Sequence, residues 1–305
     1  MKISVIGAGG FVGARVAARL AADPAVRALT LVDRMPLPAP DSHARVETIA
    51  GDITDPDLRR AATQGADAVI LLAAILGGAA EADYALARRV NIDATLAMAE
   101  ELKDRAPATR FVFASTIAVF GKPMPDPVTD LTPTAPGMVY GAQKLMIEVA
   151  LSQFARRGWL DAVSLRPAGV MARDGADAGL KSAFLSRLFW CVARGEDITL
   201  PVAPDSRTWL TSVDRVAANF IHAAQLPELG ETRAFTLPAL AVTMGELVTA
   251  LKRRFPDSPA QVRFAPDPEV VALFGSYPRL VTETADALGF QGDRDIAALI
   301  DDAMI

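Results

Sequence analysis

The first half of the chain alternates short apolar runs with longer stretches whose apolar residues recur at helical spacing, as Val12, Val16 and Leu20 do. Apolar runs of this kind are typical of strands covered by helices on both faces of a parallel sheet. The pattern predicts an α/β fold with a doubly wound parallel sheet. The predicted strands are Lys2–Ile6, Leu29–Asp33, Arg45–Ile49, Ala68–Leu72, Arg110–Ala114 and Ala162–Arg166.

The pattern changes after Arg166, where glycines, prolines and charges interrupt the alternation. This change predicts a sheet domain over residues 1–166 and a smaller C-terminal substrate lobe over 167–207 and 239–305. A return segment, about 208–238, contains one more predicted strand near Ala234–Leu237. A helix is expected over Met244–Arg254, with Thr243 as its N-cap.

Composition narrows the class of protein. The 305 residues are 51% hydrophobic and 22% charged, which argues against global disorder. The net charge of -5 gives no electrostatic reason to bind nucleic acid or anionic membranes. The longest uncharged apolar run, 68–80, is shorter than the roughly 20 residues of a membrane-spanning helix. Because the apolar run at 3–6 is too short for a signal peptide, we expect a cytoplasmic protein.

Cysteine and histidine are scarce. The single cysteine, Cys191, excludes an intramolecular disulfide and a multi-cysteine metal site. His43 and His222 stand in no recognisable metal-binding spacing, so we expect no metal.

A glycine-rich segment follows the first predicted strand. Gly7, Gly10 and Gly13 have the spacing G-x-x-G-x-x-G, and Phe11 and Val12 open the next helix. This arrangement places pyrophosphate at a helix N-terminus, and Asp33, at the end of the second strand, suits the adenosine ribose hydroxyls. Glycines alone would indicate only a tight turn, but this context predicts dinucleotide binding. Asp33 favours NAD, although Arg34 can also accept a 2′-phosphate.

Two segments offer groups for proton transfer. Tyr140 and Lys144 are four residues apart on a predicted helix and share one face. A nearby ammonium and an oxidised nicotinamide both stabilise a phenolate, so Tyr140 is a candidate general base. Ser115 and Thr116 follow a predicted strand, at the sheet edge where doubly wound folds bind ligands. Such hydroxyls also serve merely to form turns.

These motifs together resemble the extended short-chain dehydrogenase/reductase family over essentially the whole chain. The resemblance implies a Rossmann fold, bound NAD, and Thr116, Tyr140 and Lys144 as the catalytic set. The resemblance also implies further contacts with the cofactor, from Asp52, Ile53, Leu72, Ala73, Ala74, Asn91 and Pro167. Asn91 and Thr95 match the N-x-x-x-T motif of the family.

Departures from family patterns narrow the reaction. Ile117 and Ala118 stand where dehydratases carry an Asp-Glu pair, and Gly169 stands where many nucleotide-sugar enzymes carry Asn. Several stretches, among them 204–209 and 236–243, instead resemble members that oxidise the C2 hydroxyl of a small sugar acid to the 2-oxo acid. A nucleotide-sugar 4-epimerase that recycles its NAD is the alternative. The intact catalytic set argues against a third possibility, a non-catalytic NAD-binding regulator.

The predicted partner is a small anionic substrate. Ser115, Thr116 and Tyr140 are expected at the reacting hydroxyl. Arg207 is the favoured carboxylate anchor, since arginine can bind a carboxylate through two hydrogen bonds. The other candidates are Arg173, Lys181 and the hydroxyl of Ser182, and each of these cations can instead be a solvated surface charge. Family resemblance further implies a homodimer built from helices near 84–103 and 139–157.

Overall fold

A computed structural model describes residues 1–103, 109–175 and 182–305. The chain forms two compact units, each assembled from three stretches. Unit 1 comprises residues 1–120, 134–166 and 217–236, and unit 2 comprises 121–133, 167–216 and 237–305.

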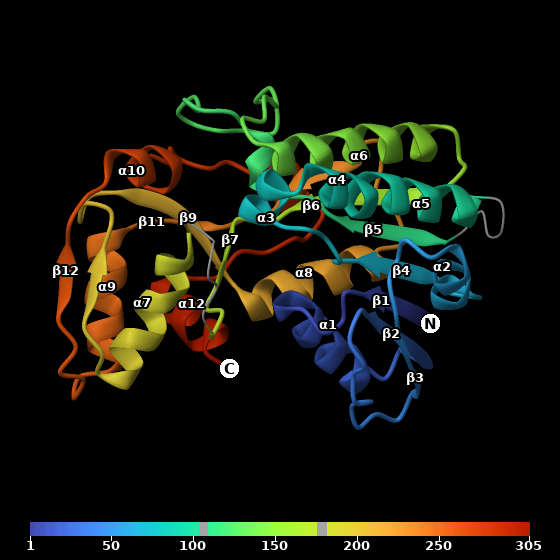
Figure 1. Ribbon diagram of the computed structural model, residues 1–305, viewed down its shortest axis with the longest axis horizontal. Coiled ribbons are helices and arrows are strands. Elements are labelled where there is room, and N and C mark those ends of the chain that lie inside the picture. Colours follow the sequence, from blue (N-terminus) through green and yellow to red (C-terminus); the bar gives the residue numbers. More distant parts are fainter. Residues whose placement is uncertain (104–108, 176–181) are drawn as a thin grey trace. The chain divides into compact units, whose positions relative to one another are not determined.

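A seven-stranded sheet forms the centre of unit 1 (Figure 1), and every neighbouring pair in it is parallel. The strand order is β10-β6-β5-β4-β1-β2-β3. From β1 the chain adds strands first on one side, as β2 and β3, and then on the other, from β4 onward, as in doubly wound dinucleotide-binding folds. The predicted fold class is therefore confirmed. The strands are β1 (Lys2–Ile6), β2 (Ala28–Asp33), β3 (Arg45–Ala50), β4 (Ala68–Leu71), β5 (Arg110–Ala114), β6 (Asp161–Arg166) and β10 (Ala234–Thr236).

Helices cover the central strands. On one face, apolar residues of α2, α5 and α6 pack with β4 and β5 around Met98, Phe113 and Ile147. Helix α1 lies on the opposite side of the strands (Figure 1). The unit 1 helices are α1 (Phe11–Ala22), α2 (Pro56–Thr63), α3 (Gly77–Ala82), α4 (Tyr84–Arg88), α5 (Thr95–Lys103) and α6 (Val139–Arg156), with a π-helical turn at Arg89–Ala94 and a 3-10 turn at Ile117–Val119.

Unit 2 has its own apolar core, which includes Leu188, Leu210, Leu247 and Leu299. A three-stranded sheet has the order β11-β9-β7, and a separate parallel pair joins β12 to β8. The elements are β7 (Gly169–Met171), α7 (Ala183–Arg194), β8 (Ile198–Leu200), β9 (Arg207–Ser212), β11 (Leu240–Thr243), α9 (Met244–Arg254), β12 (Val262–Phe264), α10 (Pro268–Phe274), α11 (Glu283–Ala287) and α12 (Ile296–Ala303). Helix α8 (Val213–Gln225) contributes residues to both units, since the chain is divided between residues 216 and 217.

The units divide the chain differently from the sequence-based boundaries. The return segment to unit 1 begins at residue 217 rather than about 208, because β9 pairs with β7 and β11 in the sheet of unit 2. Residues 121–133 also belong to unit 2, where Val128 bridges to Leu280. The predicted helix Met244–Arg254 is present as α9, and Thr243 and Glu246 form a capping box at its start.

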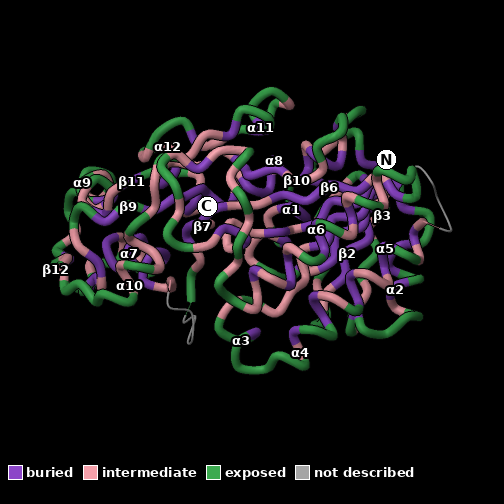
Figure 2. Tube along the Cα trace, turned by 90° about the horizontal axis from the view of Figure 1, so that it is seen from above, coloured by how far each residue is buried: buried purple, intermediate pink, exposed green. Residues whose placement is uncertain are grey.

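Burial follows the strands. Figure 2 shows buried segments along the strands of the central sheet, and many exposed segments in loops and outer helices. None of the helices in the described part of the chain is both long and apolar enough to cross a membrane.

Candidate functional site

The glycine-rich segment after β1 has no room for a side chain at Gly7 or Gly13. Gly7 has a φ of +90°, and a Cβ there would lie 2.6 Å from the amide nitrogen of Ala73. A Cβ on Gly13 would lie 1.9 Å from the carbonyl oxygen of Gly7, so helix α1 packs directly against the turn. Gly10 is the N-cap of α1 and supplies no side-chain cap. The first amides of α1, which begins at Phe11 and Val12, thus suit a phosphate group.

Asp33 ends β2 next to this turn. Its Oδ2 accepts a hydrogen bond from the Gly9 N–H at 2.8 Å. Its carbonyl oxygen accepts one from the Gly51 N–H at 2.9 Å, which holds the following Asp52-Ile53 segment beside β2. The ribose and adenine candidates Asp33, Asp52 and Ile53 therefore lie along one edge of the sheet.

Asn91 holds the segment after β4 in place. The amides of Leu72 and Ala73 donate to the Ile6 carbonyl oxygen at 2.8 and 3.0 Å, which places this segment, with Ala74 following, beside the glycine turn. The Asn91 carboxamide accepts from the Ile75 N–H at 2.8 Å and donates to the Ile75 carbonyl oxygen at 2.9 Å. Asn91 lies in the π-helical turn, a feature frequent at functional sites.

Helix α6 carries the candidate catalytic pair. The Lys144 ammonium lies 5.7 Å from the centre of the Tyr140 ring and donates to the Ala114 carbonyl oxygen at 2.7 Å. Thr116 follows two residues after Ala114, and its side-chain oxygen accepts from the Ala118 N–H at 3.1 Å. A Cβ on Gly141 would lie 2.2 Å from the Ala118 carbonyl oxygen, so α6 closely contacts this turn. The structure thus brings Tyr140 and Lys144 together at the end of β5, which leads directly into Thr116.

Burial controls the protonation of this pair. It raises the pKa of the Tyr140 phenol to about 12, although the residue keeps part of its surface exposed. It lowers the pKa of Lys144, which is only 2% exposed, to about 7, and the charge of Glu148 partly opposes that decrease. The sequence predicted that the Lys144 ammonium would lower the pKa of Tyr140. In the structure, desolvation of the phenol has the larger effect and raises that pKa. The positive charge of an oxidised nicotinamide would favour the phenolate when it binds.

Contrary to the expectation from the sequence, Ser115 does not have a hydroxyl free to contact the substrate. The residue is buried, and its hydroxyl donates to Glu148 Oε1 in a short hydrogen bond. Glu148 also pairs with the Arg166 guanidinium. Of the two hydroxyls, Thr116 is the better candidate to reach a substrate. Sequence reasoning missed Glu148, although its position four residues after Lys144 places it on the same helix face.

Gln143 was also missed by sequence reasoning. Its carboxamide oxygen accepts from Asn91 Nδ2 at 2.8 Å, and both residues are buried. This contact ties α6 to the π-helical turn. Gln143 lies three residues after Tyr140 and directly before Lys144, and no sequence motif marked it.

The other candidates lie in unit 2. Arg207 begins β9 with an exposed side chain, Pro167 directly follows β6, and Arg173 is partly buried beside α7. Ser182 is the N-cap residue of α7 but makes no side-chain cap hydrogen bond, and Lys181 lies outside the described residues. Unit 2 presents a further cation at Lys122, whose ammonium lies 3.7 Å from the centre of the Tyr277 ring.

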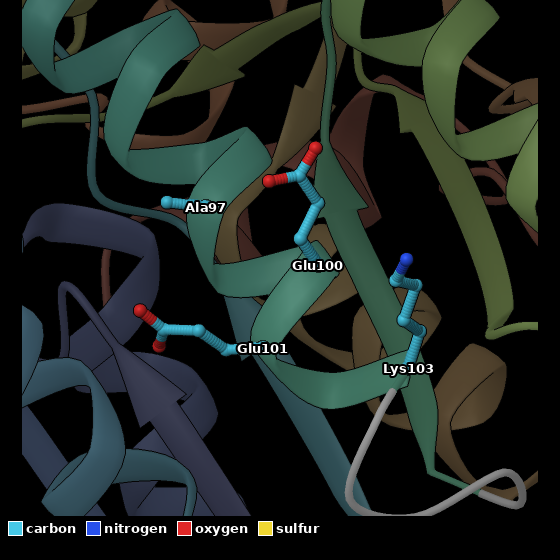
Figure 3. A pocket seen from close by; sticks show the side chains of 4 residues that line it. All are labelled: Ala97, Glu100, Glu101 and Lys103. Carbon is cyan, nitrogen blue, oxygen red and sulfur yellow. The ribbon is translucent and has the colours of Figure 1, made fainter.

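One surface hollow lies on α5, lined by Ala97, Glu100, Glu101 and Lys103. In Figure 3 the side chain of Glu101 points away from those of Glu100 and Lys103. Glu101 pairs with Arg59 of α2 at 2.9 Å. The hollow contains none of the candidate site residues. Within the described ranges, no three His, Cys, Asp or Glu side chains gather in a way that could hold a metal ion.

Known proteins match this chain over most or all of its length. Residues 3–236 match the model of the NAD dependent epimerase/dehydratase family. D-erythronate dehydrogenase of Haemophilus influenzae is 32% identical over 98% of each chain, and D-erythronate dehydrogenase of Cupriavidus necator is 34% identical over 98% of this chain and 97% of that one. Among solved structures, a nucleoside-diphosphate-sugar epimerase from Agrobacterium tumefaciens superposes with a TM-score of 0.90 at 30% identity, covering 98% of this chain and 92% of that one.

Proposed function

The chain belongs to the NAD dependent epimerase/dehydratase family, and from this premise we propose that it is an NAD-dependent dehydrogenase that oxidises the C2 hydroxyl of D-erythronate or a similar small sugar acid. The observation that carries the proposal is the full-length similarity to two D-erythronate dehydrogenases. Tyr140, Lys144 and Thr116 supply the proton-transfer groups that such an oxidation needs.

NAD fits the residues of unit 1. The glycine turn leaves room for pyrophosphate against the amides of α1, and the Asp33 carboxylate suits the ribose hydroxyls. Bound there, NAD would supply the acceptor for the hydride that leaves C2. The proposed contacts with NAD are Leu72, Ala73 and Ala74 after β4, Asn91 in the π-helical turn, and Pro167 after β6.

In the proposed mechanism, Thr116 orients the substrate hydroxyl and Tyr140 removes its proton. Lys144 contributes positive charge beside the phenol and a donor for the nicotinamide ribose. Because the ammonium is fixed on the Ala114 carbonyl oxygen, its position does not depend on the substrate. The carboxylate of the acid needs a cation, and Arg207 is proposed for this role, with Arg173 and Ser182 as further contacts.

The test is NADH production by the purified protein with NAD and a panel of four- to six-carbon aldonates, threonine and UDP-sugars. We expect net NADH release with a four-carbon acid. The alternative function, a nucleotide-sugar 4-epimerase, is favoured by the similarity to the Agrobacterium epimerase. An epimerase would convert a UDP-sugar to its epimer with no net NADH, so one assay distinguishes the two activities.

We further propose a homodimer in which α4, α5 and α6 pack against their symmetry mates. Exposed apolar side chains on these helices support the proposal: Tyr84 of α4 is 55% exposed, and Met146 and Val149 of α6 are 56% and 58% exposed. Light scattering at micromolar concentration should give twice the mass of one chain. A monomer would contradict this assembly.

A further inference from the structure

The helix face that carries Tyr140 and Lys144 continues one turn further to Glu148. Glu148 is 2% exposed, and both of its carboxylate oxygens have donors. Oε1 accepts from the Ser115 hydroxyl and from Arg166 Nε at 2.9 Å, and Oε2 accepts from Arg166 Nη2 at 2.6 Å. These donors replace the hydrogen bonds to water that a buried carboxylate loses.

This cluster joins three elements of unit 1. Glu148 comes from α6, Ser115 directly follows β5, and Arg166 ends β6. The Ser115 N–H also donates to the Leu165 carbonyl oxygen at 2.8 Å. The Arg166 guanidinium in turn lies 5.5 Å from the centre of the Phe120 ring, beyond the turn that follows Thr116.

The segment that leads into Thr116 is therefore fixed by α6 at two consecutive residues. Lys144 holds the carbonyl oxygen of Ala114, and Glu148 holds the hydroxyl of Ser115. Both anchors come from one helix face, so they define where Thr116 lies relative to Tyr140.

We propose that Glu148 is a positioning residue of the catalytic site: its ion pair with Arg166 fixes Ser115, and through Ser115 it sets the place of Thr116 beside Tyr140 and Lys144. The role rests on the proton-transfer site proposed above. It assigns to this buried ion pair a part in the reaction rather than in stability alone.

Glu148 also acts on Lys144 electrostatically. The groups that face the Lys144 ammonium are Tyr140 and Glu148 from α6, the Phe113 ring and Ala114 carbonyl from β5, and, behind Glu148, Arg166 from β6. The negative charge of Glu148 raises the pKa of Lys144 against the effect of burial. Removing that charge leaves the Arg166 cation uncompensated, so both changes lower the pKa of Lys144 further.

The test compares Glu148→Gln and Ser115→Ala, singly and combined, with Glu101→Gln as the control. Glu101 forms the other arginine pair described above, with Arg59, between α2 and α5, and lies outside the proposed site. Two experiments are made on each full-length variant. Steady-state kinetics gives kcat and KM for the sugar acid that the enzyme oxidises. NMR of isotopically labelled lysines gives the titration midpoint of Lys144, whose signal is assigned by its loss in Lys144→Met.

Glu148→Gln should lower kcat by at least about 10-fold with a smaller change in KM, because misplacement affects the reacting geometry. It should also lower the Lys144 midpoint by about one pH unit. Glu101→Gln should change neither. Ser115→Ala should also lower kcat. The kcat of the double variant should be no lower than that of Glu148→Gln, because both substitutions break the same series of contacts from Arg166 through Glu148 to Ser115.

The proposal is overturned if Glu148→Gln behaves like Glu101→Gln in both measurements. Additive losses in the double variant would also overturn it, because Ser115 would then act independently of Glu148. If Glu148→Gln does not fold, Ser115→Ala decides: an unchanged kcat contradicts the proposal. If the wild type oxidises no sugar acid, the proposed function fails, but the kcat comparison carries over to whichever reaction the panel identifies and the lysine titration still tests Glu148.

Discussion

Lys144→Met should make the cofactor-free protein more stable at neutral pH while it abolishes activity. The ammonium of Lys144 is buried against Phe113 and Tyr140, and methionine fills a similar volume without a charge. The wild type keeps a buried lysine because the proposed chemistry needs one, so replacing it should raise the free energy of unfolding at the expense of activity.

The magnitude follows from the pKa of Lys144, which burial lowers from 10.5 to about 7. Between these values the unfolded chain binds a proton that the folded chain does not, so stability falls as the pH drops from 10.5 towards 7. At about 1.4 kcal/mol per pKa unit the full shift from 10.5 to about 7 corresponds to about 5 kcal/mol. Because the lysine is half protonated in the unfolded chain at pH 10.5 and in the folded chain at pH 7, the wild type loses about 4 kcal/mol of stability between these two pH values. Losing the hydrogen bond to Ala114 costs the variant about 1 kcal/mol, which leaves a net gain of about 3 kcal/mol at pH 7.

The assay is urea unfolding of both proteins without cofactor at several pH values from 7 to 10. The difference between variant and wild type should shrink steadily as the pH rises, because the wild type recovers its stability. Lys252→Met, at an exposed position of α9, controls for the loss of a surface lysine. A difference that stays constant from pH 7 to 10 would refute the reasoning, since it would mean that Lys144 does not titrate in this range.

Three further predictions concern the reaction. Tyr140→Phe should lower kcat at least about 100-fold and keep NAD binding, measured by calorimetry; Thr116→Ser should be mild, and Thr116→Val should resemble Tyr140→Phe. Near-normal kcat in Tyr140→Phe would exclude it as the base. Arg207→Ala should chiefly raise KM for the acid in steady-state kinetics, and an unchanged KM would move the anchor to another cation. Because Asp33 repels a 2′-phosphate, kcat/KM should be clearly higher with NAD than with NADP despite Arg34, and comparable values would contradict this.

Local pattern predicted the sheet well because most of its strands are buried on both faces; the exception is the edge strand β3, which is largely exposed. The six runs singled out between residues 2 and 166 all form strands, and their ends shift by at most one residue. The glycine turn was equally readable, since Gly7 and Gly13 lie where a Cβ would collide with backbone. In both cases the physical constraint acts on residues that are close in the sequence.

Features that depend on contacts between residues far apart in the chain could not be predicted from the sequence. The pair formed by Glu148 and Arg166 joins a helix to a strand, and neither residue shows its partner in the local pattern. The residues that form β9 were placed in the return segment, because nothing local distinguishes pairing with β7 and β11 from pairing with the central sheet. The high pKa of Tyr140 likewise arises from burial by tertiary structure, whereas its spacing from Lys144 indicated only the opposing charge effect.

Each unit is assembled from three separate stretches of the chain, and this affects folding during synthesis on the ribosome. Strand β10, the edge partner of β6, emerges only after β7, α7, β8 and β9 of unit 2 have been made. Until then β6 presents an unpaired edge, which is a template for pairing with other chains. Neither unit corresponds to an uninterrupted gene segment, so a truncation after residue 166 would leave that edge permanently open and should be prone to aggregation.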